Sequence, residues 1–461
     1  MQLTILAAFA VAVSLLEMPH VLLAVPGEQT AAAIALYWGG AAGLSLLAGR
    51  LALHNLTAGR TPRRLGAQRL TALASHLWLV GGLAGVLMMG YGHFLLYDLR
   101  LIHAPWVAVV SAVAVFTVAL GLNWLAGYPL HVLTRRRLAQ SLPFPVCKWS
   151  LGQYLSHTLR HQLLFLAVPI LTILLIRDVL GLYICPSLPT DIQGWVFLLG
   201  TLASMIGVFL LSPLAIIHLW RTRSLPEGPL RRQLEHVLRS LNVRCRDIRV
   251  WHTDGVIANA AAVGIFSPLR YILLSDLLVE RLDEPRLRAV FAHEAGHVRE
   301  HHVFYATLFA VSSVMLIGVL VDAAMMRFSP PEWVGQTAAA LLLAAWLPAF
   351  GWFSRRLERQ SDVIGAWAGG DEASRARGDI TPDGAAAFAW ALQAIAALSG
   401  LPLGQFNWRH GSIAQRCQYI LTLGAAGGNR QPLDRFISRL KLALWLLLAV
   451  VIALVMWQGW A

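Results

Sequence analysis

Charged side chains are scarce in this sequence. Asp, Glu, Lys and Arg together make up 13% of the 461 residues, whereas about a quarter is typical of soluble globular proteins. Apolar residues make up 57% of the chain. A chain this apolar is neither an ordinary soluble domain nor a disordered segment, because both require far more charge. The composition therefore predicts a membrane protein.

Cysteine is also rare. The chain has four, namely Cys147, Cys185, Cys245 and Cys417, and they lie far apart without forming a Cys-x-x-Cys pair. Disulfide frameworks and cysteine zinc sites both need cysteines in even, closely spaced sets. The sequence therefore indicates neither a disulfide framework nor a zinc site made of cysteines.

Two common catalytic signatures are absent, a phosphate-binding glycine loop and a Gly-x-Ser-x-Gly elbow. Acidic residues are outnumbered, with 24 Asp and Glu against 37 Lys and Arg, which gives a net charge of +13. A nucleic-acid-binding protein gathers its basic residues on one folded face, but here they lie between apolar runs. The arrangement excludes nucleic acid as the expected partner and points to a lipid bilayer.

Long apolar runs are what the sequence has in abundance. A hydrocarbon core of about 30 Å requires about 20 apolar residues in an α-helix. Nine runs are candidates, at approximately 3–25, 31–52, 72–97, 104–126, 162–184, 194–220, 303–326, 337–353 and 440–459. We expect four spans in residues 1–130, a basic loop and two spans in 131–220, a catalytic part in 221–439 interrupted by two spans at about 303–353, and a last span in 440–461.

The loops between these runs differ in charge. Basic residues gather after the second, fourth and sixth runs, as Arg60, Arg63, Arg64 and Arg69, then Arg135, Arg136, Arg137, Lys148 and Arg160, then Arg221, Arg223, Arg231 and Arg232. The alternate loops, at 26–30, 98–103, 185–193 and 328–336, hold only Arg100, with Arg327 at their edge. Since basic loops stay in the cytoplasm, the N-terminus is expected inside and the C-terminus outside.

This topology brings two hydrophilic segments, about 221–302 and 354–439, to the cytoplasmic side. In the first, residues 229–241 have apolar residues at helical spacing, and 247–251, 256–266 and 271–275 are predicted strands. A helix is expected over 284–303, because Pro285 follows an acidic residue at its start. The two segments therefore predict one small α+β domain.

The expected helix carries His293-Glu294-Ala295-Gly296-His297. Residues four apart on a helix point the same way, so His293 and His297 can present two imidazoles to one metal, with Glu294 beside them. This spacing is typical of zinc peptidases, in which the glutamate is the general base for a zinc-activated water. The alternative is two surface histidines on a basic helix. With the apolar runs, the motif predicts a multi-pass α-helical membrane protein with a small α+β zincin-type cytoplasmic catalytic domain.

A catalytic zinc needs a third protein ligand and an open position. Glu358 is the candidate, since it follows the eighth run on the same side of the membrane as the motif. Asp362 lies one helical turn further and can accept the second ring N–H of His293 or His297. The alternative is a solvated interfacial helix with Glu–Arg pairs. We expect one Zn²⁺ per chain, and His301 and His302 at a helix end or the membrane interface rather than as ligands.

Four segments occur in the order of a known family. They are Asn259 to Gly264 (NAAAVG), His293 to His302 (HEAGHVREHH), Ser354 to Ala366 (SRRLERQSDVIGA) and His410 to Arg416 (HGSIAQR). With these motifs the chain resembles the integral-membrane zinc metallopeptidases that include HtpX and the CAAX prenyl endopeptidase. Gly411 stands where that family has proline. The resemblance covers about residues 230–430 and leaves the first four spans outside it.

The resemblance implies a gluzincin fold, with ligands His293, His297 and Glu358 and with Glu294 as base. It further implies that the strand of Asn259 lines the cleft and receives an extended substrate as an added strand. His410 and Arg416 are candidates for stabilising a developing oxyanion, with structural pairing as the alternative. It also implies a bacterial cell (inner) membrane as the location.

The expected function is zinc-dependent endoproteolysis of membrane-associated or misfolded proteins. Protein or peptide substrates and the bilayer are the expected partners, and no feature of the sequence indicates an oligomeric state. The sequence also allows two alternatives. One is a receptor-type signalling peptidase gated by the N-terminal spans, and the other is a non-catalytic membrane scaffold stabilised by zinc.

Overall fold

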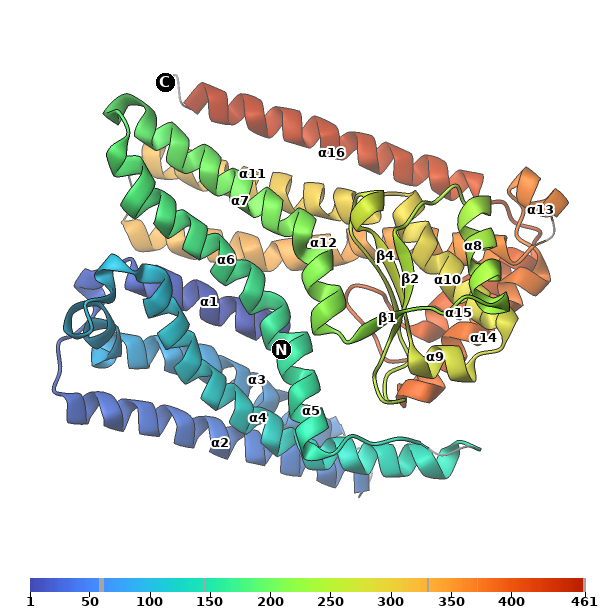
Figure 1. The fold of residues 1–461 in the computed structure, drawn as a ribbon, viewed down its shortest axis with the longest axis horizontal. Coiled ribbons are helices and arrows are strands. Elements are labelled where there is room, and N and C mark those ends of the chain that lie inside the picture. The colour runs from blue at the N-terminus through green and yellow to red at the C-terminus, as the bar shows by residue number, and fades with distance from the viewer. Residues whose placement is uncertain (58–61, 144–145, 330, 371, 459–461) are drawn as a thin grey trace. The chain divides into compact units, whose positions relative to one another are not determined.

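The computed structural model describes residues 1–57, 62–143, 146–329, 331–370 and 372–458. Arg60, in the first basic loop, lies outside them. The chain forms two compact units, Met1–Arg221 and Thr222–Ala461, and is 79% helical with one small sheet (Figure 1). In the described part, eight helices are long and apolar enough to cross a membrane. The chain is thus a multi-pass helical membrane protein with a small α+β domain.

The first unit is a helical assembly. Its helices are α1 (Gln2–Leu16), α2 (Gly27–Thr57), α3 (Pro62–Val86), α4 (Pro105–Ser141), α5 (Leu151–Thr158), α6 (Phe165–Val179) and α7 (Thr190–Leu219). Its core is an apolar cluster shared by α1, α3 and α4, with Phe9 and Phe116 almost fully buried. Small residues on α4, such as Ala108 and Ala112, have no exposed surface and allow neighbouring helices to approach closely.

The first helix is shorter than the run over 3–25 predicts. α1 ends at Leu16, and a short 3-10 turn, Pro19–Val21, follows it. Pro19 explains the break, since proline has no N–H for the helix and restricts the residue before it. Glu17, just past the helix, pairs with Arg177 of α6 at 2.5 Å. With 15 residues, α1 is about 22 Å long, which is less than a hydrocarbon core.

The second unit contains a four-stranded sheet in the order β1-β2-β4-β3. Its strands are β1 (Thr222–Ser224), β2 (Asp247–Trp251), β3 (Ala260–Val263) and β4 (Tyr271–Ser275). β2 and β4 are parallel, and β1 and β3 are antiparallel to their neighbours. β2 and β4 have the predicted bounds, whereas β3 occupies only part of 256–266 and β1 was not predicted. Since β3 comes last in the strand order, it lies at an edge of the sheet.

The helices of this unit are α8 (Pro229–Ser240), α9 (Asp276–Arg281), α10 (Glu284–Arg299), α11 (His302–Phe328), α12 (Glu332–Ala368), α13 (Glu372–Arg377), α14 (Pro382–Ser399), α15 (Ile413–Ala425) and α16 (Gln431–Gln458). Figure 1 shows α11, α12 and α16 running side by side away from the sheet. The helix predicted over 284–303 breaks instead at His301, which has a left-handed backbone with φ 56°. The break lets α11 start in a new direction beside α10.

Candidate metal centre

The helix α10 presents the two histidines of the motif. Its N-terminus is capped by Asp283, whose side chain accepts the Arg286 N–H at 3.2 Å, and Pro285 occupies the first turn. Leu287 and Phe291 are buried and fix the face that α10 turns to the core. His293 and His297 follow one turn apart on the helix, so the same packing directs both imidazoles to one point.

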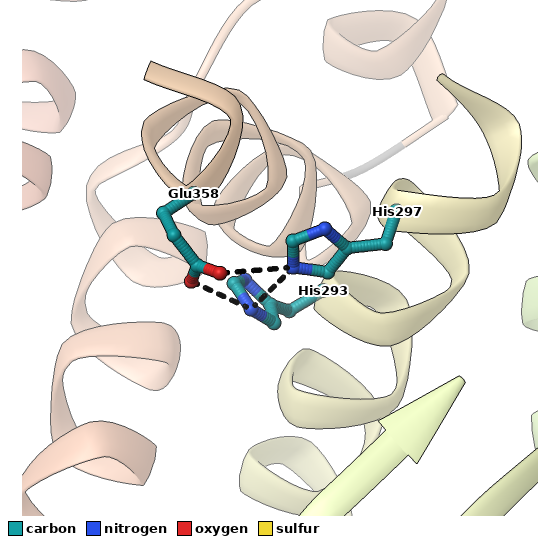
Figure 2. Close-up of side chains that lie close together, drawn as sticks. All are labelled: His293, His297 and Glu358. Carbon is teal, nitrogen blue, oxygen red and sulfur yellow. Dashed lines mark hydrogen bonds and ion pairs between the residues drawn. The ribbon is translucent and has the colours of Figure 1, made fainter. Parts of the chain in front are cut away.

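Helix α12 brings a carboxylate to that point. Glu358, 7% exposed, places its Oε2 3.7 Å from His293 Nε2 and its Oε1 3.7 Å from His297 Nε2. The two Nε2 atoms are 3.3 Å apart. Figure 2 shows the three side chains converging from two helices.

These separations fit a zinc ion. Four ligands at 2.0–2.1 Å in a tetrahedron are about 3.3 Å from one another, close to the 3.3 and 3.7 Å observed here. Two imidazole nitrogens and one carboxylate oxygen are also a common donor set for catalytic zinc. His293, His297 and Glu358 are the group of three potential ligands that the described residues bring together. The residues present therefore fit the metal that the motif implies.

The second nitrogen of His293 faces a carboxylate. Nδ1 lies 3.1 Å from Asp362 Oδ1, and an ionised carboxylate can only accept, so Nδ1 carries the proton and Nε2 keeps its lone pair. Burial alone would lower the pKa of His293, but Asp362, together with Glu294 and Glu358, outweighs it and raises that pKa. Asp362 thus orients His293.

Arg416, from α15, neutralises this buried carboxylate. Its Nε donates to Asp362 Oδ2 at 2.9 Å and its Nη2 to Oδ1 at 2.6 Å. Nη2 also lies 3.7 Å from Glu358 Oε2. Burial would lower the pKa of Arg416, but the adjacent carboxylates raise it. Arg416 therefore pairs with Asp362 next to the candidate metal ligands, and it also lines the cleft above them.

The second nitrogen of His297 begins a chain of hydrogen bonds. His297 Nδ1 lies 2.9 Å from His302 Nδ1, His302 Nε2 lies 2.9 Å from Gln360 Oε1, and Gln360 Nε2 donates to Asp434 Oδ1 at 2.7 Å. Each step crosses to another helix, from α10 to α11, α12 and α16. His302 is only 2% exposed, so water does not replace these contacts.

The donor and acceptor roles in this series of hydrogen bonds follow from Asp434 at its end. The Asp434 carboxylate only accepts, so the Gln360 amide nitrogen faces it and the amide oxygen faces His302. His302 Nε2 must then donate, which leaves Nδ1 of a neutral imidazole as an acceptor. His297 Nδ1 donates to it, and His297 Nε2 is left with a free lone pair on the side of Glu358. Both candidate ligand histidines are thus held with an unprotonated nitrogen toward Glu358, as a metal ligand requires.

Glu294 lies next to this site but is not part of the triangle. Its Oε2 accepts the backbone N–H of Ala262 in β3 at 3.0 Å. Asn259 and β3 pair with β4 through alternate residues, so Ala260 and Ala262 direct their backbone groups to the open edge of the sheet. Burial raises the pKa of Glu294 and lowers that of His297 to about 4. His297 is therefore neutral at pH 7, as a ligand must be.

A cleft of about 540 Å³ opens over these residues. Its walls include β3 with Asn259 on one side and the loop before α15 on the other. His410 in that loop places Nδ1 2.9 Å from Glu358 Oε1. Seven of the eight candidate site residues line this cleft, and the eighth, Asp362, contacts His293, which lines it.

Three contributors were missed by sequence reasoning. His302 was expected at a helix end, where it is, but its role as the partner of His297 depends on the break at His301. Gln360 and Asp434 are ordinary polar residues in sequence, and only the packing of α12 on α16 brings them to His302. The one available signal was the density of His and polar residues between 293 and 302.

Comparisons with known proteins show which proteins the chain is similar to. Residues 224–390 match the model of Peptidase family M48. A CAAX prenyl protease 1 homolog from Oryza sativa subsp. japonica is 28% identical over 134 residues, 29% of this chain and 30% of that protein. Protease HtpX from Stutzerimonas stutzeri (strain A1501) is 26% identical over 193 residues, 38% of this chain and 65% of that protein. The chain thus spans less than two thirds of the length of these relatives.

At the level of fold, the chain is similar to the crystal structure of S. mikatae Ste24p. The TM-score is 0.50 at 14% identity, and the match covers 83% of this chain and 98% of that one. Such coverage exceeds the second unit, so the likeness extends into the N-terminal helices, which the sequence motifs had left outside it. The chain is thus similar to peptidase family M48 over residues 224–390, to HtpX and CAAX prenyl protease 1 over the aligned parts of their sequences, and to Ste24p in its fold.

Proposed function

We propose that the chain is a zinc-dependent endopeptidase, with His293, His297 and Glu358 as metal ligands and Glu294 as general base. The observation that carries this proposal is the set of ligand separations, 3.3 and 3.7 Å, beside a carboxylate that is not itself a ligand. A purely structural zinc site has four protein ligands and needs no such neighbour.

Zinc in such a site supplies Lewis acidity, polarising a carbonyl and allowing water to lose a proton near neutral pH. The protein's own residues supply the proton transfer, the orientation of the imidazoles and the binding of the substrate. Glu294 accepts the proton and returns it to the leaving amine, and its raised pKa makes it a better base than an ordinary glutamate. Asp362 and His302 hold the ligand imidazoles in the required tautomer. The edge of β3 offers backbone groups to an extended substrate, which favours broad specificity.

The position of Glu358 on a membrane helix bears on the substrate. α12 is uncharged from Thr337 to Ser354, and Glu358 lies five residues after Phe353, about 7.5 Å along the axis. The site is therefore close to the membrane surface. We propose membrane-associated or misfolded proteins as substrates, with the catalytic domain in the cytoplasm of a bacterial cell, in keeping with the basic loops and the HtpX relatives.

Hydrolysis of an unfolded reporter tests this function. Detergent-purified protein is expected to cleave casein, to lose at least 100-fold in rate with a zinc chelator, and to recover with added zinc, because the ligands alone do not activate water. Peptide release and zinc content are measured together. An enzyme that binds one zinc per chain but cleaves neither casein nor a membrane-tethered peptide would support the scaffold instead.

Replacing His302 is expected to weaken zinc binding. His302→Leu removes the acceptor for His297 Nδ1, and loss of such a partner typically costs 10–100-fold in metal affinity. His302→Gln is the matched control, since a glutamine oxygen can accept from His297 while its amide donates to Gln360. Zinc affinity is measured by competition with a chelator, independently of activity. Equal affinities for the wild type and His302→Leu would show that the hydrogen-bond chain does not position His297.

A further inference from the structure

The loop between α14 and α15 displays apolar side chains to its surroundings. Every residue from Leu401 to Arg409 is exposed. Leu401, Leu403, Phe406 and Trp408 have exposed fractions of 47%, 43%, 62% and 39%. In water, this display would be unfavourable, because burial of such side chains is a main source of stability.

The loop is nevertheless well ordered by its own hydrogen bonds. The Ala414 N–H donates to Leu403 O at 2.9 Å, and the Asn407 side chain accepts the N–H groups of Arg409 and His410 at 2.9 and 3.2 Å. Asn407 and Gly411 also form a bridge. The apolar side chains are therefore held outward by a defined backbone, rather than by a lack of structure.

The loop rests on α12. Arg355 Nη1 donates to Trp408 O at 2.5 Å, and the Trp408 ring lies 6.1 Å from that of Phe350. The Arg355 guanidinium also lies over the Phe406 ring at 5.6 Å. A Cβ on Gly351 would meet Trp408 O at 2.8 Å, so the contact depends on a glycine in the membrane helix.

This contact fixes the depth of the loop relative to the membrane. Residues 337–354 of α12 carry no charge, and Arg355 and Arg356 are the first cations after them. Trp352, which is exposed, has Arg356 over its ring at 5.1 Å. Aromatic residues beside basic ones at the end of an apolar span mark the boundary between hydrocarbon and headgroups. The loop touches α12 at 350–355 and so lies at this boundary.

We infer that residues 401–409 are a membrane-contact loop, in which Leu401, Leu403, Phe406 and Trp408 enter the bilayer interface while Arg355 and Arg409 meet lipid phosphates. Lipid is the occupant that fits, because the loop continues the membrane-facing surface of α12 and combines apolar with cationic groups. A folded protein partner or a second copy would not require the loop to lie at the level of the headgroups.

The loop connects this lipid contact to the metal site. Leu401, Gln405, Phe406 and Arg409 line the cleft, and His410 at the end of the loop lies 2.9 Å from Glu358. Given the proposed peptidase function, one wall of the cleft is thus part of the membrane interface. Segments that lie on or emerge from the bilayer would enter along this wall, while soluble chains would enter from the β3 side.

Fluorescence quenching tests the lipid contact without any activity. The 461-residue chain, with Cys147 and Cys245 replaced by serine, is labelled at Leu403→Cys in nanodiscs of phosphatidylethanolamine and phosphatidylglycerol. Arg239→Cys on α8 is the exposed control. We expect brominated lipid to quench the label at 403 several-fold more than at 239, and iodide to do the reverse. Iodide quenching equal at both positions, or protection from both quenchers, which would mean a protein cover, overturns the inference.

A substrate comparison tests the consequence. Leu403→Ser/Trp408→Ser is expected to raise KM about tenfold for a peptide tethered to the nanodisc lipid and to leave casein hydrolysis within about twofold of wild type. Unchanged zinc affinity shows that the site is intact. Equal effects on both substrates, or on neither, would contradict delivery along the loop. A wild type that cleaves neither substrate would refute the proposed function, whereas the quenching result stands on its own.

Discussion

Glu294→Gln is expected to reduce kcat/KM by about 10²–10⁴-fold while zinc remains bound. General acid–base catalysis by a positioned side chain contributes this much, and an amide cannot accept the proton. The substitution keeps the shape of the side chain, and the amide oxygen can still accept the Ala262 N–H that Glu294 accepts at 3.0 Å. Since Glu294 is not one of the three proposed ligands, zinc content and thermal stability should change little.

The measurement is the rate of casein hydrolysis alongside zinc content for the wild type, Glu294→Gln and a matched control. Glu284→Gln serves as that control, because it makes the same change at an exposed position in the first turn of α10. A Glu294→Gln enzyme that keeps activity within tenfold of wild type would place the proton acceptor elsewhere. Loss of zinc would instead show that Glu294 supports the ligands.

Local patterns predicted much of this architecture. Apolar runs of about 20 residues predicted most of the membrane helices, and β2 and β4 have the predicted bounds because their apolar residues lie between turn residues. Where one residue overrides a pattern, the prediction failed. Pro19 ends α1 within an apolar run, and His301 breaks the expected long helix with a left-handed backbone that no glycine announced.

The candidate site also combines residues that local spacing predicts with partners that it does not. His293, Glu294 and His297 follow from helical spacing alone, and Glu358 and Asp362 follow from their place after a membrane span and their own one-turn separation. The partners of these residues could not be read from spacing. Arg416 reaches Asp362 from 54 positions away and Gln360 reaches Asp434 from 74, so only the packing of the helices brings them together.

Arg416→Leu is expected to lower the free energy of unfolding by about 3–5 kcal/mol, the typical cost of removing one partner of a buried ion pair. The side chains of Asp362 and Glu358 are only 3% and 9% exposed, so neither carboxylate can regain the water that it has lost. With Arg416 removed, Asp362 would bind a proton and lose its hold on His293. Zinc affinity should therefore fall together with stability.

A double-substitution cycle separates the pair from simple loss of packing. In Asp362→Asn/Arg416→Leu, the unpaired carboxylate is gone, so the double variant should lose less stability than the sum of the two single variants. Arg409→Leu, an exposed arginine of the neighbouring loop, is the matched control and should change the unfolding free energy by less than about 0.5 kcal/mol. Thermal unfolding in detergent, with and without zinc, gives the change in stability for each single variant, for the double variant and for Arg409→Leu. Additive effects would mean that Arg416 contributes packing rather than charge, and Asp362 would then be stabilised within the site by His293 alone.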